Sequence, residues 1–297
     1  MSDKLLVTGA SGQLGRLVLH HLLETQKVRP QRIVAASRDT SKLAEFTAKG
    51  VEVRKADFDD ETSLPAAFEG IDRVLIISTD AVGEPGKRLR QHLAAVEAAK
   101  KAGVAHILYT SMPKPDAGSP VTFAGDHRET EESVKATGIP YTIIRNSWYQ
   151  ENLLGSLPQV VSSGKWYSSA GDGRVSHVAR DDTAAAIAAA LASSTNESAI
   201  YTLTGPTSFT TAEIAAQVSE ATGKPIEVVK VSDEALAEGI KAATGLPAPV
   251  VNLIVSFDTN TRLGRVDFVT DDVRKLTGRE PASLRAFLNA NKASLGA

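Results

Sequence analysis

Three glycines near the start of the chain have the spacing of a turn that binds phosphate. Gly9, Gly12 and Gly15 lie three positions apart, between the apolar run 5–7 and a stretch with helical periodicity. Glycine lets the backbone turn tightly and approach phosphates closely, and the following helix presents free N–H groups to an anion. A strand, a glycine-rich turn and a helix in this order bind the pyrophosphate of a dinucleotide. The residues predicted to form this site are Gly9, Ser11, Gly12, Gln13, Leu14 and Gly15.

The residues after the expected second strand favour a phosphorylated cofactor. A site for NAD usually places Asp or Glu there, because a carboxylate binds the ribose 2′-OH. This chain has Ser37 and Arg38 instead. A hydroxyl and a guanidinium suit a 2′-phosphate, which a carboxylate would repel, and Arg16 could add positive charge. We therefore expect NADPH as the preferred cofactor, with NADH possible because Asp39 follows Arg38.

A further candidate position follows the expected third strand. Asp57 and Phe58 come shortly after residues 51–55. An adenine ring usually packs at this point of a dinucleotide-binding sheet, and the Asp57 carboxylate could accept a hydrogen bond from the adenine amine. An aspartate in an ordinary turn would have the same spacing. Asp57 and Phe58 are thus candidate adenine contacts, with the turn interpretation left open.

These positions belong to a regular alternation of strands and helices. The clearest helix, residues 86–102, places Leu89, Leu93 and Val96 on one face and ends at Gly103, a common C-terminal residue of helices. Short apolar strands separated by helices are typical of an α/β Rossmann fold, a doubly wound parallel sheet with helices on both faces. The predicted strands of the first half are residues 4–8, 32–36, 51–55, 73–77, 105–110 and 141–145.

The pattern changes after residue 146. Residues 162–173 are rich in Ser and Gly and predict a loop or hairpin, and the remainder from 225 predicts helices joined by turns. We expect a dinucleotide-binding domain over 1–150, to which 174–204 returns. A smaller, mostly helical C-terminal lobe over 151–173 and 205–297 would bind the substrate at the junction. Further predicted elements are a helix at 181–191, a strand at 199–204 and a helix at 210–222 that begins with a capping box (Thr210, Glu213).

Composition excludes several classes of function. The chain has 297 residues and a formal net charge of −2, which gives no reason to expect a nucleic-acid partner. It has no cysteine, which rules out a disulfide framework, a zinc–thiolate site and a cysteine nucleophile. The histidines show no metal-ligand spacing, and no apolar stretch approaches the ~20 residues that span a membrane. We expect a cytoplasmic enzyme, a monomer or homodimer, without a metal and without a membrane partner.

Several motifs together resemble a known family. Besides the glycine turn, Arg38 and Asp57, they are 109–111 (Tyr-Thr-Ser), 126–131 (Asp-His-Arg-Glu-Thr-Glu), 139–142 (Ile-Pro-Tyr-Thr), 145–152 (Arg-Asn-Ser-Trp-Tyr-Gln-Glu-Asn) and 170–173 (Ala-Gly-Asp-Gly). The stretch 145–152 is the most specific of these. On these residues the chain resembles the NmrA-like group of atypical short-chain dehydrogenase/reductases. Within that group it is most similar to the bacterial NAD(P)H:quinone oxidoreductases of type 2, relatives of triphenylmethane reductase. The resemblance covers nearly the whole chain and is looser beyond about residue 222.

The resemblance implies a cleft where cofactor and substrate meet. It implies that residues 146–149 lie near the nicotinamide, and that Ser78 and Thr79 approach the cofactor from the carboxyl edge of the sheet. Trp148 and Tyr149 offer flat apolar area on which a quinone ring could stack, or they are core aromatics. The resulting candidates are Ser78, Thr79, Thr110, Asn146 and Trp148 for the cofactor, and Trp148, Tyr149 and Asn152 for the substrate.

The usual acid–base pair of short-chain dehydrogenases is missing. Most members use Tyr-x-x-x-Lys with a Ser, in which the Tyr is the general acid and the Lys lowers its pKa. The matching helix, about 126–137, has His127 and Glu131 at that spacing, while Thr110 and Ser111 stand where the serine is expected. Reduction of a quinone needs no such pair, because the product oxygens can take protons from water. The candidate catalytic residues are His127, a proton donor or a packed helix residue, and Tyr149.

We therefore expect an NADPH-dependent oxidoreductase that transfers hydride directly to a quinone or another flat electron acceptor. One alternative is a non-catalytic redox sensor of the NmrA type, which would bind the dinucleotide and act through a partner protein. Another is a reductase of triphenylmethane-type dyes. The aromatic and neutral character of Trp148, Tyr149 and Asn152 favours a substrate wall over a sensor.

Overall fold

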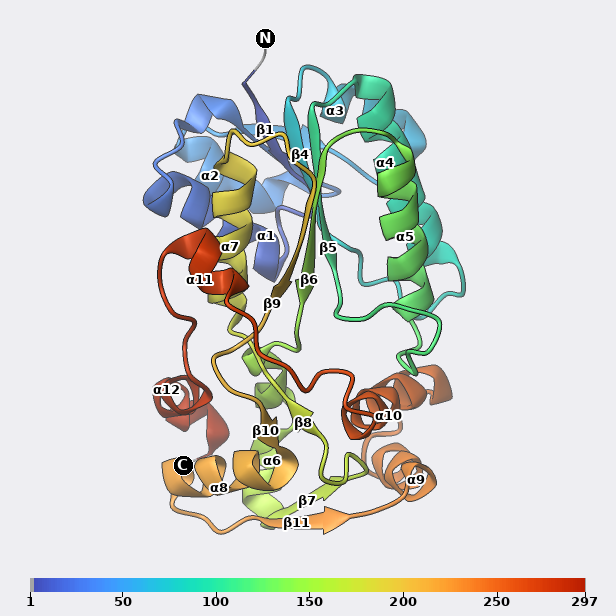
Figure 1. Cartoon of the computed structure of the whole chain (residues 1–297), viewed down its shortest axis with the longest axis vertical. Coiled ribbons are helices and arrows are strands. Elements are labelled where there is room, and N and C mark those ends of the chain that lie inside the picture. Colours follow the sequence, from blue (N-terminus) through green and yellow to red (C-terminus); the bar gives the residue numbers. More distant parts are fainter. Residues whose placement is uncertain (1–2, 297) are drawn as a thin grey trace. The chain divides into compact units, whose positions relative to one another are not determined.

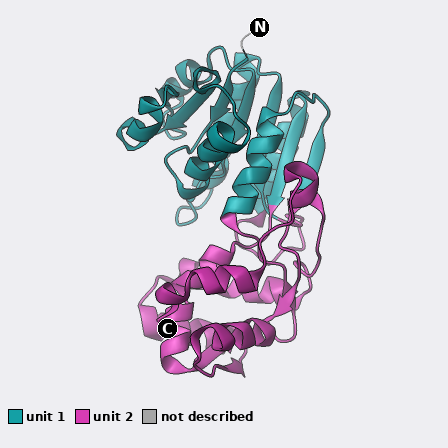
Figure 2. Ribbon diagram, turned by 90° about the vertical axis from the view of Figure 1, so that its left-hand side faces the viewer, with its two compact units in different colours: residues 1–112, 125–145, 181–201 teal, residues 113–124, 146–180, 202–297 magenta. Residues whose placement is uncertain are grey.

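A seven-stranded β-sheet organises the first of two compact units in this computed structural model, which describes residues 3–296 (Figures 1 and 2). The strand order is β3-β2-β1-β4-β5-β6-β9, and the pairings from β3 through β6 are parallel. Every predicted strand of this sheet is present, with ends that differ by at most one residue. The strands are β1 (Leu5–Val7), β2 (Ile33–Ser37), β3 (Glu52–Lys55), β4 (Arg73–Ile76), β5 (His106–Ser111), β6 (Tyr141–Asn146) and β9 (Ala199–Leu203).

Helices cover both faces of this sheet, which confirms the predicted Rossmann fold. Figure 1 shows α1, α2 and α7 on one face and α3, α4 and α5 on the other. The helices are α1 (Gln13–His20), α2 (Ala44–Ala48), α3 (Leu64–Phe68), α4 (Lys87–Ala102), α5 (Ala124–Ala136) and α7 (Arg180–Ala192). A π-helical turn, His21–Thr25, extends α1, and short 3₁₀ turns lie at Pro30–Arg32, Thr40–Leu43 and Glu61–Ser63. The strand order reverses between β1 and β4, and ligands of such sheets bind beyond the carboxyl ends of the strands at this point.

The core of the first unit consists of strand residues that are buried on both sides of the sheet. Leu6, Val34, Val74 and Ile107 are fully buried and pack with apolar residues of α3 and α4, such as Phe68. Parallel strands that are covered on both faces have nearly continuous apolar sequences, because neither face meets water. This explains why β1, β2, β4 and β5 are buried along their whole lengths.

The buried face of α4 differs from the predicted one. The helix has the expected bounds and ends at Gly103, whose φ of 68° is left-handed. Leu93, however, is 37% exposed and lies outside the buried face. The side chains that α4 buries are Arg88, Gln91, His92, Ala95, Val96 and Ala99. Of the predicted apolar face, Val96 is buried and Leu93 is not, because polar residues of α4 that find hydrogen-bonding partners inside the unit share the buried face.

The second unit contains Pro113–Ala124, Asn146–Arg180 and the chain from Thr202 onward (Figure 2). The segment Pro113–Ala124 was not separated by the sequence prediction. Of the residues in the predicted domain ranges, Met1, Ser2 and Ala297 lie outside the described part of the chain. The helices of this unit are α6 (Leu157–Ser163), α8 (Thr211–Thr222), α9 (Asp233–Thr244), α10 (Ala248–Arg262), α11 (Asp272–Thr277) and α12 (Leu284–Ala290), with 3₁₀ turns at Gln150–Gly155 and Lys292–Leu295.

Two small sheets complete the second unit. β7 (Lys165–Ser168) pairs in parallel with β11 (Glu227–Lys230), and β8 (Arg174–Val175) pairs antiparallel with β10 (Phe209–Thr210). Residues 162–173 were predicted as a loop or a hairpin; the hairpin is wrong, because the strand in this range pairs with a distant segment, and residues 169–173 form a loop. The predicted capping box is confirmed: Thr210 accepts from the backbone N–H of Glu213, whose carboxylate accepts from the N–H of Thr210. Within residues 3–296, no helix is long and apolar enough to cross a membrane.

Candidate active site

The glycine turn has the geometry that phosphate binding requires. Gly9 has a φ of +60°, and its carbonyl accepts from the N–H of Gly12 at 3.0 Å. Gly12 is the N-cap of α1. A Cβ on Gly15 would lie 2.4 Å from the carbonyl oxygen of Gly9, so only glycine permits this close approach of helix and turn. Gly12 and Gln13 are exposed, and the start of α1 is therefore open to an anion.

The end of β2 presents a hydroxyl pair and an exposed arginine. The Ser11 and Ser37 hydroxyls lie 2.7 Å apart, and Arg38 is exposed beside them in the chain. Asp39 accepts from the backbone N–H and the hydroxyl of Ser41, and this hydrogen bond lowers the pKa of Asp39. The Asp39 carboxylate thus caps the turn Thr40–Leu43.

Arg16, which the sequence suggested as an additional positive charge, contacts residues near the start of α2. Its guanidinium forms an ion pair with Glu45 at 2.7 Å and donates to the carbonyl of Lys42. It also lies over the ring of Phe46, with 5.7 Å between Cζ and the ring centroid. Arg16 is thus engaged by residues of the first unit, whereas Arg38 is exposed, so Arg38 is the residue to test first for recognition of a 2′-phosphate.

Asp57 lies in a turn, and one oxygen of its carboxylate accepts a backbone hydrogen bond. Its Oδ1 accepts from the backbone N–H of Asp59, and its own N–H donates to the hydroxyl of Ser63. The turn interpretation therefore describes these contacts, while an adenine contact through Oδ2 stays a prediction. Phe58 is half-buried and packs against the core of the first unit.

The carboxyl ends of β4 and β5 bring three predicted cofactor residues together. The backbone N–H of Ser78 donates to the Thr110 hydroxyl at 2.8 Å, and that hydroxyl donates to Ser78 Oγ. The N–H of Thr79 donates to His92 Nε2 at 3.0 Å. Thr79 Oγ1 is buried and has no hydrogen-bonding partner among residues 3–296. An unsatisfied buried hydroxyl at this edge of the sheet fits a contact to a bound molecule.

His127 is buried inside the first unit. Its Nδ1 lies 2.8 Å from the Tyr109 hydroxyl, and Arg88 Nη2 donates to its Nε2 at 2.9 Å. Burial, together with the Arg88 charge, lowers the pKa of His127 well below its usual value. The imidazole is therefore neutral at pH 7. This environment gives no support to the hypothesis that His127 donates a proton, and favours the alternative of a packed helix residue.

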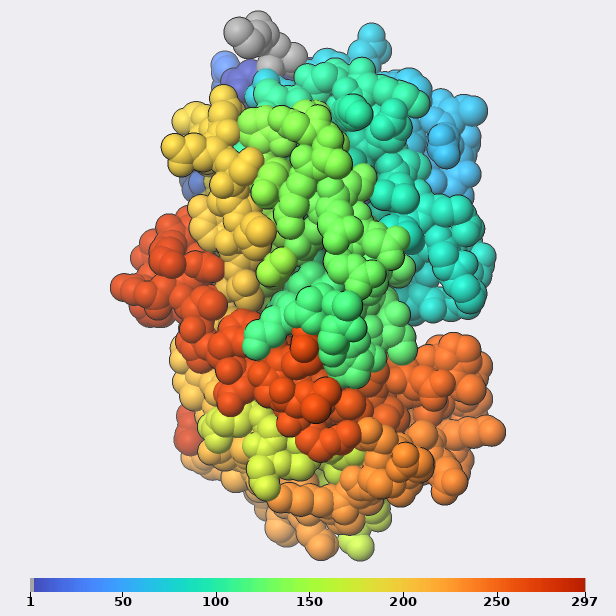
Figure 3. Space-filling model, turned by 45° about the vertical axis from the view of Figure 1, so that its right-hand side comes forward, coloured from blue at the N-terminus to red at the C-terminus, as the bar shows by residue number. Residues whose placement is uncertain are grey.

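Glu131 lies four positions after His127, at the spacing of the Tyr-x-x-x-Lys pair. It is buried, and its carboxylate accepts two hydrogen bonds from Arg145, at 2.9 and 2.7 Å. The Ser111 hydroxyl donates to the same carboxylate at 2.7 Å. Figure 3 shows the outer face of α5, the helix that carries His127 and Glu131, in green. A carboxylate held in this way cannot lower the pKa of a nearby phenol as a lysine does, so the usual acid–base pair is absent.

In the second unit, the stretch that follows β6 places an amide, an indole and a phenol together. Asn146 Nδ2 donates to the Tyr149 hydroxyl at 3.1 Å, and the Arg180 guanidinium lies 4.8 Å from the centroid of the Tyr149 ring. Burial raises the pKa of Tyr149 to about 12, so the phenol stays protonated. Trp148 packs edge-on against Phe257, with 4.9 Å between ring centroids.

Four buried polar atoms of residues 146–150 lack hydrogen-bonding partners within the described chain, among them Ser147 Oγ and Gln150 Oε1. Asn146 Oδ1 and Trp148 Nε1 are buried, and neither has a hydrogen-bonding partner among residues 3–296. Asn152 is exposed, in the turn Gln150–Gly155. Sequence reasoning missed Phe257 and Arg180, because nothing in their own segments indicates that they contact residues 146–149.

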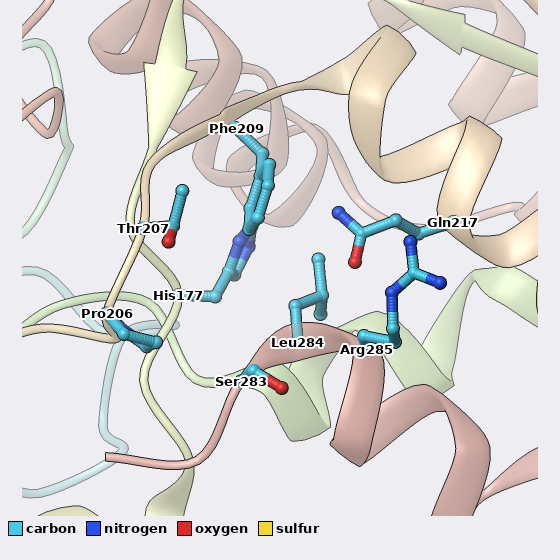
Figure 4. A pocket seen from close by; sticks show the side chains of 8 residues that line it. All are labelled: His177, Pro206, Thr207, Phe209, Gln217, Ser283, Leu284 and Arg285. Carbon is cyan, nitrogen blue, oxygen red and sulfur yellow. The ribbon is translucent and has the colours of Figure 1, made fainter. Parts of the chain in front are cut away.

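The second unit also has a separate cavity of about 280 Å³ (Figure 4). Figure 4 shows the Phe209 ring and the polar ends of Gln217 and Arg285 around it. A cavity in the first unit, of about 570 Å³, lies between α3 and α4 and is lined by residues such as Leu64 and Ala98. None of the predicted site residues lines either of these two cavities.

Comparison with known proteins gives consistent matches over the whole chain. The model of the NmrA-like family matches residues 1–288. The structure resembles that of an NADPH-dependent quinone oxidoreductase from Escherichia coli, solved with NADPH, with a TM-score of 0.90 and 34% identity; the match covers 96% of this chain and 99% of that one. It also resembles a triphenylmethane reductase from Citrobacter sp., solved with NADP(H), with a TM-score of 0.89 and 33% identity over 97% and 100% of the two chains. An NAD(P)H azoreductase from Xenophilus azovorans is 30% identical over 296 residues, 99% of each chain.

Proposed function

Because the chain belongs to the NmrA-like family, we propose that it is an NADPH-dependent reductase that passes hydride to a quinone. We infer the type of reaction from the buried Glu131, which is bound by Arg145 and Ser111 and stands in place of a catalytic lysine. Such a site has no phenol with a lowered pKa that could protonate the alkoxide formed when a ketone is reduced. It suits an acceptor whose product takes its proton from water.

The residues of the first unit fit NADPH. The left-handed Gly9 and the close approach at Gly15 leave the N–H groups at the start of α1 to bind the pyrophosphate. Arg38 would bind the 2′-phosphate, beside the hydroxyls of Ser11 and Ser37. When bound, NADPH supplies a hydride ion to the acceptor. The NADPH and NADP(H) in the structures of two relatives support this assignment.

The residues of the 146–152 stretch would hold the acceptor and the reactive end of the cofactor. The Asn146 carbonyl and the Trp148 N–H are buried hydrogen-bonding groups that a ligand would satisfy. The Tyr149 hydroxyl accepts from Asn146, so its own proton remains to donate to a substrate oxygen. The overall reaction adds one hydride and one proton to a quinone and yields a hydroquinone. Positioning is therefore the contribution of these side chains, and water supplies the proton.

The experiment follows the absorbance of NADPH or NADH in the presence of benzoquinone, menadione or a triphenylmethane dye. We expect consumption with a quinone and a lower KM for NADPH than for NADH. Arg38→Ala should raise the KM for NADPH by about tenfold or more, because a charge-assisted hydrogen bond is lost, and should leave the KM for NADH nearly unchanged.

Arg29→Ala is the matched control. Arg29 is also exposed, and it precedes β2 whereas Arg38 follows it. An unchanged KM for NADPH in Arg38→Ala would contradict the cofactor assignment. Consumption with the dye alone would assign the protein to dye reduction. Measurable NADPH binding without consumption by any acceptor would favour the redox sensor instead.

A further inference from the structure

One residue at the carboxyl edge of the sheet, Thr79, has both its backbone N–H and its backbone carbonyl hydrogen-bonded to buried side chains of α4. The N–H of Thr79 donates to His92 Nε2 at 3.0 Å, and Arg88 Nε donates to the carbonyl of Thr79 at 2.7 Å. Arg88 and His92 are four positions apart and therefore lie on the same face of the helix. They are 5% and 0% exposed. We call this pair the Thr79 clamp.

A second layer of hydrogen bonds orients both members of the clamp. Arg88 Nη2 donates to His127 Nε2, and His127 Nδ1 lies 2.8 Å from the Tyr109 hydroxyl. His92 Nδ1 lies 3.1 Å from the Thr130 hydroxyl. Tyr109 comes from β5, and His127 and Thr130 come from α5. The clamp is thus supported by elements on two sides, which leaves Arg88 and His92 few alternative orientations.

The identity of the donors determines the protonation of both histidines. Because the N–H of Thr79 can only donate, His92 Nε2 accepts, and the proton of this neutral ring is on Nδ1. Because arginine can only donate, His127 Nε2 accepts from Arg88, and the proton of His127 is on Nδ1 as well. Burial lowers the pKa of His92 to about 3, so the ring stays a neutral acceptor under ordinary conditions. The Thr79 clamp therefore keeps one hydrogen-bonding pattern.

This arrangement is costly, which suggests that the position of Thr79 matters. Burying the Arg88 guanidinium and the His92 imidazole carries a desolvation penalty that leucines on the same face of α4 would avoid. The backbone N–H and the backbone carbonyl of Thr79 both have hydrogen-bonding partners, yet the hydroxyl of Thr79 is buried without a partner among residues 3–296. A loop whose backbone is fixed and whose side chain is left unsatisfied is suited to binding another molecule.

We propose that Arg88 and His92 are positioning residues that hold Thr79 so that its hydroxyl binds NADPH. The proposal rests on the proposed function, since it needs NADPH at the carboxyl edge of the sheet. It assigns the buried polar face of α4 to cofactor binding and not to proton transfer. His127 and Tyr109 act through the clamp, and neither needs to touch the cofactor.

The test is a double-mutant cycle on the dissociation constant of NADPH, measured by titration without an acceptor. Thr79→Ala should weaken NADPH binding by about tenfold, because a buried hydrogen bond is lost. His92→Leu removes the acceptor for the Thr79 N–H and should weaken binding to a similar degree. In the His92→Leu background, Thr79→Ala should cost less than about twofold, because the hydroxyl is no longer held in place. His92→Gln restores an acceptor and should recover most of the affinity.

The control is a second buried histidine of the same unit. His106 lies at the start of β5, fully buried, with Nε2 2.8 Å from the Thr142 hydroxyl. In the His106→Leu background, Thr79→Ala should retain its full tenfold effect. If His92→Leu does not fold, Arg88→Lys replaces it, because lysine keeps the charge and loses the hydrogen bond from Nε.

The outcomes separate this proposal from the proposed function. An effect of Thr79→Ala that is the same in the wild-type and His92→Leu backgrounds would overturn the clamp and leave the NADPH assignment standing. A Thr79→Ala variant that binds NADPH like the wild type would do the same. Failure of the wild-type protein to bind NADPH at all would overturn both.

Discussion

The replacement Gly15→Ala offers a sharp test of the phosphate-binding turn, because its expected sign is opposite to the usual one. Alanine normally stabilises a helix relative to glycine, by up to about 1 kcal/mol. At Gly15, however, the new Cβ would lie 2.4 Å from the Gly9 carbonyl oxygen and 2.8 Å from Ala10 Cα. Both neighbours are backbone atoms, which cannot rotate away. Helix and turn must therefore separate.

The magnitude follows from the cost of overpacking. Inserting a methyl group into a tight site typically costs about 1–3 kcal/mol, and the gain in helix propensity offsets part of this. We expect a net destabilisation of about 1–2 kcal/mol, which corresponds to a fall in Tm of about 2–3 °C for a protein of this size. NADPH binding should weaken by at least about tenfold, because the N–H groups of the turn move away from the pyrophosphate.

The matched control is Gly239→Ala in α9. Gly239 is exposed and helical, and a Cβ there would meet nothing within 4 Å. This variant should be more stable than the wild type by about 0.5–1 kcal/mol and should bind NADPH normally. Thermal unfolding and NADPH titration of the two variants provide the comparison. A Gly15→Ala variant with a Tm equal to or above that of the wild type would refute the close packing of α1 on the turn.

Three further predictions concern other parts of the chain. Glu131→Gln should lower the free energy of unfolding by about 2–3 kcal/mol, because it leaves the partly buried Arg145 charge without its carboxylate. Denaturant unfolding measures this free energy, and an unchanged midpoint would contradict the prediction. Tyr149→Phe should raise the KM for the quinone about tenfold. Because burial raises the pKa of Tyr149 to about 12, the wild-type KM for the quinone should show no tyrosine ionisation between about pH 7 and 10. An ionisation in that range that the Phe variant lacks would show that the phenol loses its proton at a lower pH. Finally, the folded protein should lose stability as the pH falls from 6.5 toward 3, because the pKa of His92 is about 6.5 in the unfolded chain but about 3 in the folded protein. Thermal unfolding at several pH values should show that the Tm of His92→Gln falls less steeply with decreasing pH than the Tm of the wild type. Equal slopes for the two proteins would argue against a buried neutral His92 ring.

The alternating elements of the first half were predictable from sequence because they depend on local properties. Apolar runs bounded by turn residues indicate β1, β2 and β4 by themselves, and the Gly103 cap marks the end of α4. The capping box of α8 is likewise contained in four consecutive residues. By contrast, the parallel pairing of β7 with β11 joins segments about sixty residues apart, and no local signal distinguishes it from a hairpin.

The site residues divide in the same way. The glycine spacing and the exposed Arg38 were visible in the sequence, because each depends on the conformation of a few neighbouring residues. The pairing of Arg16 with Glu45 was not, because it depends on how α1 packs beside α2. The same holds for the contact between Trp148 and Phe257, which lie on segments far apart in the chain.

By itself the sequence determined a dinucleotide-binding sheet, a turn for its phosphates and the loss of the Tyr–Lys pair. All three depend on residue type and spacing within short segments. Only the tertiary structure decided what replaces that pair: His127 is buried behind Arg88 and Tyr109, and Glu131 is bound by Arg145. The physical reason is that a side chain's charge state and hydrogen bonds depend on burial and on partners from other elements. The same histidine could be an exposed acid or a buried neutral acceptor, and packing selects the second.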